Sequence, residues 1–157
     1  MKKIKENIYV SNLIFSDTLN SNGRIYSSET VLNMKKQFEE KLLKNPVFGE
    51  LGYPASFETS VKNISHKINR VYFENKKYPR KIKKKLKRLG LFDSKKILKG
   101  EIQLLDTPNG RLAKVIFDEL VARPRSTGTV DRNGNVTIQE VLTFDLINKK
   151  DDAFKEK

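Results

Sequence analysis

The amino-acid sequence predicts an α+β fold, with a curled, largely antiparallel β-sheet or barrel and helices on its outside. Two observations support this prediction. Five segments alternate apolar and polar residues or are rich in β-branched and aromatic residues, which is typical of strands, while others space apolar residues at helical intervals. The chain has 157 residues, 37% of them hydrophobic, so we expect one domain, residues 1–157, around one core.

The first half of the chain predicts a strand, then a helix, then a second strand. Residues 7–15 (NIYVSNLIF) have strand composition. Residues 28–44 predict a helix that ends at Asn45-Pro46, because its apolar residues recur along one side: Val31, Met34, Phe38 and Leu42. The Gly/Pro-containing stretch GELGYPAS then predicts a loop. Residues 57–73 predict a second strand, in which Ile64, His66 and Ile68 share one face.

The second half predicts three strands and two helices. Ile82, Leu86 and Leu89 indicate a short amphipathic helix that Gly90 stops. Residues 100–106 predict a strand and residues 110–120 a helix. Residues 121–130 and 135–147 then form a predicted hairpin around DRNGN, whose Asn-Gly pair favours a tight turn.

The positive charge is concentrated in residues 76–99. The whole chain carries +13, but this segment holds twelve Lys/Arg and one Asp, or +11, which leaves twenty basic and eighteen acidic residues elsewhere, or +2. We interpret about 75–99 as a basic insertion and expect it to bind a partner rather than form only a solvated face. The partner is either an acidic protein surface or nucleic acid. The predicted contact residues are Ile82, Lys83, Lys84, Lys85, Leu86, Lys87, Arg88 and Phe92.

Several classes of protein and site are excluded by composition. The chain has no Cys and one His, His66, which excludes disulfides, thiol catalysis and multi-His metal sites. We expect no cofactor and no metal. No apolar run approaches the roughly 18–20 residues of a membrane span, and no unbroken apolar stretch follows the basic start, so neither membrane insertion nor secretion is expected.

Four stretches in order resemble one protein family: NGRIYS (22–27), GELGYP (49–54), ISHKI (64–68) continuing through KGEIQLLDTPNGR (99–111), and RPRSTGTV (123–130). They are similar to motifs of the prohead proteases of tailed bacteriophages, the head-maturation serine proteases related in fold to herpesvirus assemblin. The resemblance covers about 110 residues and implies an assemblin-like fold. It also implies that the GELGYP loop lies beside RPRSTG.

The resemblance also implies a degenerate site. The family's catalytic His falls at Tyr53 and its nucleophilic Ser at Arg123, whereas Arg125 and Gly128 match the family's Arg and second Gly. His66 matches a His of the family that is a candidate third triad member. Tyr is a poor base at neutral pH and Arg cannot attack a carbonyl, so we expect no catalytic residue and a vestigial cluster of Tyr53, His66 and Arg123.

The function implied is that of a catalytically inactive prohead-protease homologue, a structural or auxiliary capsid protein of a tailed bacteriophage. Its partners would be the major capsid protein or other head proteins, with packaged DNA as an alternative partner of the basic segment. Its location would be the virion, assembled in the host cytoplasm. Two other functions stay open: an active maturation protease that uses Ser126 with His66, and a nucleic-acid-binding head protein that uses residues 76–99.

Overall fold

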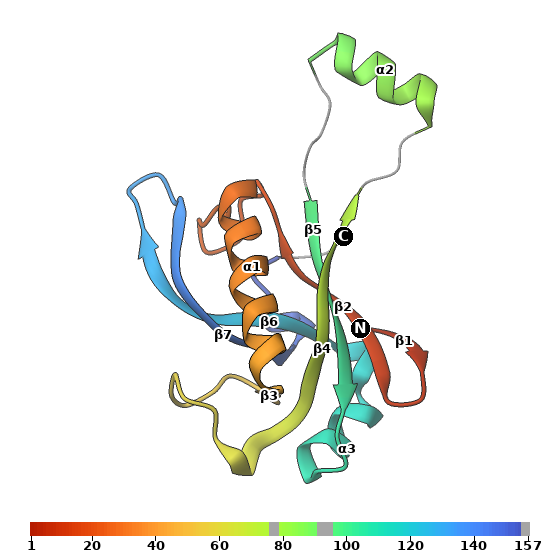
Figure 1. The fold of residues 1–157 in the computed structure, drawn as a ribbon, viewed down its shortest axis with the longest axis vertical. Coiled ribbons are helices and arrows are strands. Elements are labelled where there is room, and N and C mark those ends of the chain that lie inside the picture. Colours follow the sequence, from red (N-terminus) through yellow and green to blue (C-terminus); the bar gives the residue numbers. More distant parts are fainter. Residues whose placement is uncertain (76–78, 91–95, 155–157) are drawn as a thin grey trace.

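The computed structural model describes residues 1–75, 79–90 and 96–154 (Figure 1). Its strands form two antiparallel sheets. The first has the order β1 (Lys2–Lys5), β2 (Ile8–Phe15), β5 (Lys96–Leu104), β4 (Ile64–Asn75) and β3 (Val47–Glu50). The second pairs β6 (Leu120–Val130) with β7 (Val136–Asn148) as a long hairpin. Helices and antiparallel strands together agree with the predicted α+β class.

The predicted closed barrel, or single curled sheet, is wrong. β1, which the sequence did not predict, covers the edge of β2, so β6 cannot join the sheet there. β6 is instead held to β2 by side chains: the Ala122 N–H donates to Ser11 Oγ at 3.0 Å. At the other edge, among the described residues, only a parallel bridge between Leu51 and Leu146 extends pairing from the first sheet to β7. The two sheets therefore pack together without closing.

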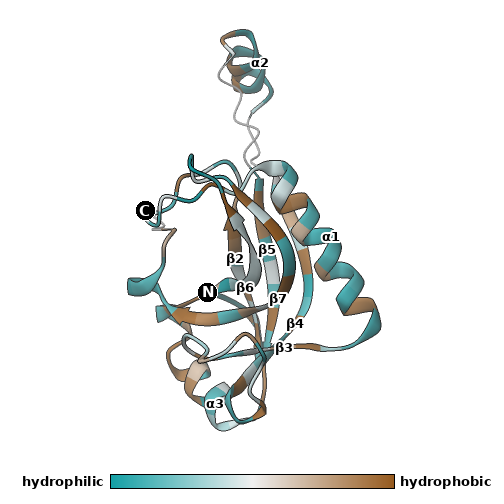
Figure 2. Cartoon of the chain, turned by 90° about the vertical axis from the view of Figure 1, so that its left-hand side faces the viewer, coloured by the Kyte–Doolittle hydropathy of each residue, from teal (hydrophilic) through white to brown (hydrophobic). Residues whose placement is uncertain are grey.

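Helix α1 (Ser28–Lys44) covers one side of the strands (Figure 2). The hydroxyl of Ser27 caps its start by accepting from the Thr30 N–H at 3.1 Å, and Asn45 ends it as predicted. Its buried stripe packs against β7 and β4, with the rings of Phe38 and Phe144 edge to face at 5.0 Å between centroids. The core lies between α1, the five-stranded sheet and the β6–β7 hairpin.

Several predicted boundaries are corrected by local hydrogen bonding. Residues 57–63 are a loop and a short 3-10 turn, not strand, because side chains rather than a neighbouring strand bind their backbone. Part of the predicted GELGYPAS loop is strand β3. Helix α3 (Pro108–Val115) begins at the Thr107 cap and ends five residues before the predicted limit of 120. A 3-10 turn follows it, and Phe117 in this turn packs on Tyr9 at 5.0 Å between ring centroids.

Helix α2 (Arg80–Arg88) confirms the predicted amphipathic helix in the basic segment. It ends before Gly90, whose φ of +66° suits glycine and whose N–H donates to the Lys87 carbonyl. The figures draw α2 beyond one end of the strands, opposite α3 (Figures 1 and 2). β4 and β5 are neighbours up to the pair Asn75 and Lys96, so the segment that carries α2 leaves and re-enters the sheet at one point.

Candidate functional site

Arg123, which the resemblance aligns with the nucleophile of the prohead proteases, lies on β6 with 8% of its surface exposed. Its Nε and Nη2 donate to the two carboxylate oxygens of Asp152 at 2.6 and 2.5 Å, and its Nη1 donates to the Asn12 carbonyl at 2.5 Å. The guanidinium also lies 5.5 Å from the ring centroid of Phe154. Arg123 therefore ties β6 to β2 and to the segment that follows β7, and its group cannot attack a carbonyl.

Arg125, two residues further along β6, is equally buried in a second ion network. It donates to both oxygens of Asp145 at 2.8 and 2.5 Å and lies 2.8 Å from the Glu50 carboxylate. Burial lowers the pKa of Arg125, but hydrogen bonds and charge from Asp145 and Glu50 outweigh burial and raise it. The Arg125–Glu50 contact places the RPRSTG strand against the GELGYP stretch, as the resemblance implies.

Arg125 also fixes the loop that follows β3. Its Nη1 donates to the Phe57 carbonyl at 3.1 Å, and Glu50 accepts from the Ser60 N–H at 3.3 Å. These bonds use side chains from β3 and β6 to hold a stretch of backbone that has no ladder partner of its own. The loop is thus positioned by the same ion network that joins the two motifs.

His66 is fully buried on β4. Its Nε2–H donates to the Phe144 carbonyl at 2.8 Å, which leaves Nδ1 to accept from the Ser65 hydroxyl at 2.7 Å. Burial, partly offset by the Phe144 bond and by Asp145, lowers the pKa of His66 to about 4, so the ring is neutral at pH 7. Gly49 is required beside it, because a Cβ there would lie 2.3 Å from Nε2 and 2.4 Å from the Phe144 carbonyl oxygen.

Tyr53, which the resemblance aligns with the catalytic base of the prohead proteases, lies outside the core with 68% of its surface exposed. Its hydroxyl donates to the Asp151 carbonyl at 2.9 Å. Desolvation and the nearby charges of Asp151 and Asp152 raise its pKa, with Arg123 opposing them. The phenol is therefore protonated at neutral pH and is no general base.

The predicted site residues fall into two groups. Tyr53 and Arg123 meet around residues 151–152, whereas His66 lies with Glu50, Asp145 and Arg125. Ser126 is half-buried on β6 opposite Val141, and no hydrogen bond joins it to His66 among the residues that the structure describes. The serine that does contact His66 is Ser65, which sequence reasoning missed although it is the preceding residue in ISHKI.

Sequence reasoning also missed the three carboxylates that neutralise Arg123 and Arg125. Asp152, Asp145 and Glu50 are all buried. A signal was present for Asp145, since it interrupts the apolar run of a strand, where a charge requires a partner. For Asp152 and Glu50 the sequence pattern carried no such signal.

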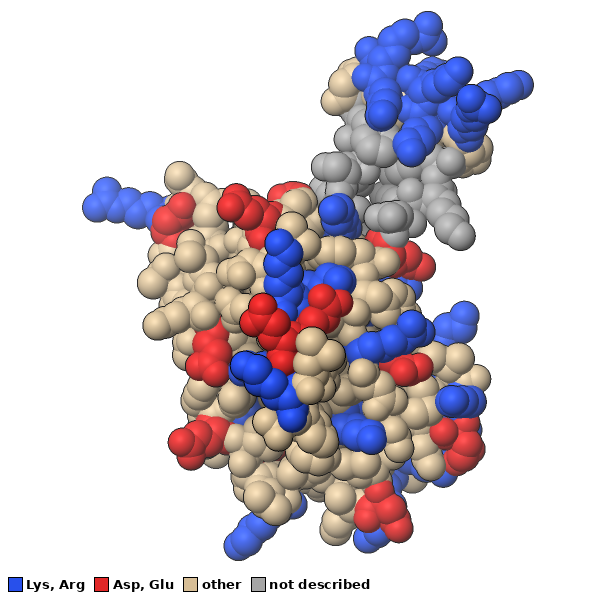
Figure 3. Space-filling view, viewed as in Figure 1, with Lys and Arg blue, Asp and Glu red and all other residues tan. Residues whose placement is uncertain are grey.

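The predicted partner-binding residues lie on α2, except Phe92, which falls outside the described residues. Ile82 is 48% exposed and Leu86 half-buried, and α2 has no buried residue. Figure 3 shows Lys and Arg over much of α2, while the body mixes both signs of charge.

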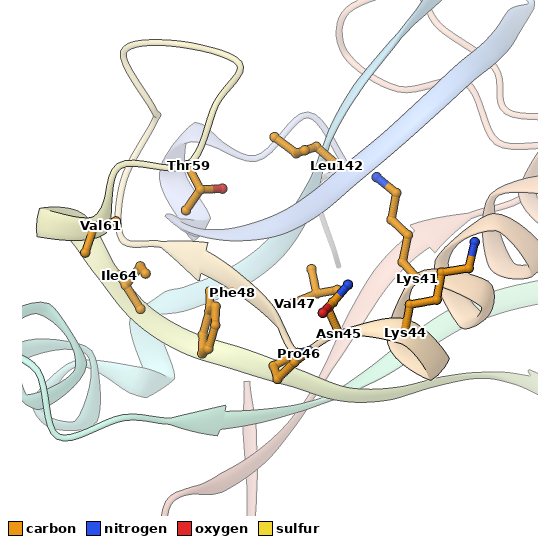
Figure 4. Close-up of a pocket in the computed structure, with 10 residues that line it drawn as sticks. All are labelled: Lys41, Lys44, Asn45, Pro46, Val47, Phe48, Thr59, Val61, Ile64 and Leu142. Carbon is orange, nitrogen blue, oxygen red and sulfur yellow. The ribbon is translucent and has the colours of Figure 1, made fainter.

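A separate groove of about 430 Å³ opens beside β3 (Figure 4). Arg123, Arg125, His66 and Tyr53 do not line this groove. Its lining is mostly apolar, with two lysines at one end: Lys41, Lys44, Asn45, Pro46, Val47, Phe48, Thr59, Val61, Ile64 and Leu142.

Within residues 1–75, 79–90 and 96–154, no group of three His, Asp or Glu side chains is arranged to hold a metal ion. Nor does that part of the chain contain a helix with the length and apolar character of a membrane span.

The fold is similar to that of a known phage protein, whereas the sequence matches no known family. No family model matches the sequence, and no curated protein sequence does. The fold is similar to that of the capsid assembly protease gp21 of bacteriophage T4, with a TM-score of 0.55 and 15% identical residues over 90% of this chain and 77% of that chain. The likeness shows the fold alone, and it confirms the prohead-protease-like fold that the four sequence motifs predict.

Proposed function

We propose that this chain is a non-cleaving homologue of the phage head proteases and acts as an auxiliary structural protein of a tailed-phage head. One observation carries the proposal. The position that the resemblance assigns to the nucleophile holds Arg123. Its guanidinium is buried, and its Nε and Nη2 donate to the two carboxylate oxygens of Asp152. A guanidinium stays protonated in a protein and its nitrogen lone pairs are delocalised over the cation, so it cannot attack a carbonyl as a serine hydroxyl does.

The remaining family positions support the same conclusion. Tyr53 is a protonated, exposed phenol rather than a base. Both ring nitrogens of His66 are engaged, by Ser65 and by the Phe144 carbonyl. The Ser65–His66 hydrogen bond has the length of a catalytic dyad, but both side chains have no exposed surface, so a peptide carbonyl would have to enter the core to reach them.

The proposed partners are the major capsid protein and other head proteins, and the proposed location is the virion, assembled in the host cytoplasm. Two observations support this part: the family resemblance of the four motifs, and the fold shared with a protein that is named a capsid assembly protease.

Two measurements test the proposal. The purified chain is incubated with the major capsid and scaffold proteins of a tailed phage that carries it, and with a serine-directed fluorophosphonate probe, using an active prohead protease as the positive control. We expect neither cleavage nor labelling. Cleavage that is abolished by Ser126→Ala or Ser65→Ala would overturn the proposal.

The second measurement is the protein composition of mature virions by quantitative mass spectrometry. A structural role predicts that the chain is retained at a fixed ratio to the major capsid protein. Loss of the chain from mature heads would contradict that role even if no cleavage is found.

A further inference from the structure

The part of the basic segment that lies between β4 and β5, residues 76–95, is longer than a connection between these two strands requires. Asn75 on β4 already faces Lys96 on β5, and a two-residue turn is enough to close such an antiparallel pair. The chain instead uses the twenty residues 76–95, and helix α2 lies among them. Helix α2 contributes no buried residue to the core, and the connection does not require a helix. We therefore expect α2 to have a role outside the fold.

Helix α2 is poorly stabilised by its own sequence. Seven of its nine residues, RKIKKKLKR, are basic and none is acidic. Four like-charge pairs are spaced i,i+4, beginning with Arg80 and Lys84, and each such pair opposes the helix by about 0.2–0.5 kcal/mol. The cap residue Pro79 provides no side-chain bond, and isolated helices shorter than about 12 residues are marginal in water. Carboxylates from a partner would remove this repulsion.

The same helix carries an apolar stripe. Ile82, Leu86 and Leu89 follow the i, i+4, i+7 spacing of one helix side, and Ile82 and Leu89 are 48% and 58% exposed. The basic side chains occupy the rest of the circumference. The fitting surface is therefore an apolar groove with carboxylates along its rim, the arrangement by which amphipathic basic helices bind acidic proteins.

These features favour protein over nucleic acid as the partner. Phosphates would neutralise the lysines but offer little apolar surface to the stripe. The rest of the chain carries only +2, and on the face drawn in Figure 3 its Lys and Arg are interspersed with Asp and Glu, so no basic track continues from α2 along that face of the described residues.

We propose that α2 is a docking helix that inserts its Ile82–Leu86–Leu89 stripe into an apolar groove rimmed by Asp and Glu on a partner protein. The identification of the partner as a head protein rests on the proposed function above. The apolar, acidic character of the groove is inferred from the residues of α2 and does not depend on that function. Charge would steer and orient the encounter, and the stripe would supply contact area.

The test uses the full chain and three variants. The charge variant replaces Lys83, Lys84, Lys85, Lys87 and Arg88 with serine. The stripe variant carries Ile82→Ser and Leu86→Ser, and leaves the charge unchanged. The matched control replaces five exposed lysines of the body with serine: Lys2, Lys5, Lys62, Lys149 and Lys150. Circular dichroism and thermal unfolding establish that each variant keeps the folded body.

Binding is measured against four probes. The first is DNA-free shells of the major capsid protein of a tailed phage that carries this chain, by co-sedimentation. The second is calcium-loaded calmodulin, a protein of known acidic, apolar groove. The third and fourth are a 30-base-pair DNA duplex and vesicles of phosphatidylcholine with phosphatidylserine, which test the two other kinds of anionic surface.

We expect the charge and stripe variants each to weaken binding to the shells by about tenfold or more, and the control variant by less than about twofold. DNA binding should fall in the charge variant alone. Undiminished shell binding by the stripe variant, or tighter binding to DNA or vesicles than to either protein, would overturn the inference. So would equal binding by all variants to shells.

The design separates this inference from the proposed function. Suppose that the wild-type chain does not bind the shells but binds calmodulin, and that the charge and stripe variants both bind calmodulin more weakly. The docking-helix inference is then supported and the proposed capsid role is contradicted. If it binds neither protein, the docking helix fails whatever the virion composition shows. Proteolytic activity toward head proteins would overturn only the proposed function.

Discussion

Removing the Arg123 side chain tests whether the buried ion pair with Asp152 holds the segment after β7 to the sheets. The two side chains are 9% and 3% exposed, so Arg123→Ala would leave a carboxylate in the core without its cation. Breaking such a pair typically costs about 3–5 kcal/mol. Asp152 would keep the N–H bond of Phe154 at 3.0 Å, so we expect the lower end, about 3 kcal/mol of unfolding free energy.

Urea unfolding followed by circular dichroism measures this loss. In a domain of this size it corresponds to a fall of about 6–12 °C in Tm. The matched control is Arg111→Ala, which breaks an ion pair with Asp106 whose side chains are 61% and 91% exposed. Pairs at the surface contribute about 0–1 kcal/mol, so the control should change little.

A second variant distinguishes the ion pair from simple packing. Replacing both partners, with Arg123→Met and Asp152→Leu, removes the buried charge together with its counter-charge and should recover most of the lost stability. Equal losses from Arg123→Ala and Arg111→Ala, or a double variant at least as unstable as Arg123→Ala, would refute the reasoning.

Three further predictions concern the core and the insertion. The pKa of His66 is about 4 in the folded state and ordinarily 6.5, so the unfolded state binds a proton first as the pH falls. The free energy of unfolding should therefore decrease by up to about 3 kcal/mol between pH 6.5 and pH 4. The decrease should be smaller in His66→Gln, which has no imidazole to titrate. Gly49→Ala should cost about 1–3 kcal/mol or more, measured by urea unfolding, because the backbone of Phe144 blocks the methyl group; Gly100→Ala, which meets only the end of the Leu13 side chain, should cost less. Replacing residues 76–95 with Asn-Gly should change Tm by no more than about 4 °C, because α2 buries no residue.

The parts of the fold that the sequence predicted are those with long periodic patterns. Helix α1 and strands β6 and β7 carry enough alternation to fix their type and most of their length. The two edge strands, β1 and β3, have only four residues each, which is too short for a pattern to emerge. The sheet also stays open for reasons that no pattern records, such as the use of Ser11 to bind the Ala122 N–H.

The sequence motifs predicted that the RPRSTG and GELGYP stretches are neighbours, but not which side chains each of their residues contacts. The motifs identified Arg123 and Arg125 and placed GELGYP beside them, and the Arg125–Glu50 contact agrees. The acidic partners depend on which face of each strand turns inward after the sheets pack, and Asp152 lies beyond the last strand altogether. Pairing over 29 residues is a tertiary property, so it could not be found from local spacing.

Arg123 and Arg125, on either side of Pro124, are both buried on β6. Residues 123 and 125 share one face of the strand, and each guanidinium has its own carboxylate. The Ala122 N–H points away from β7 toward Ser11, and Pro124, two residues on, has the same orientation, so its missing N–H removes no ladder bond. Under the proposed function, the nucleophile position has become a structural tie. A return to serine at 123 alone would leave Asp152 buried without its cation, so recovering a hydroxyl there would destabilise the fold.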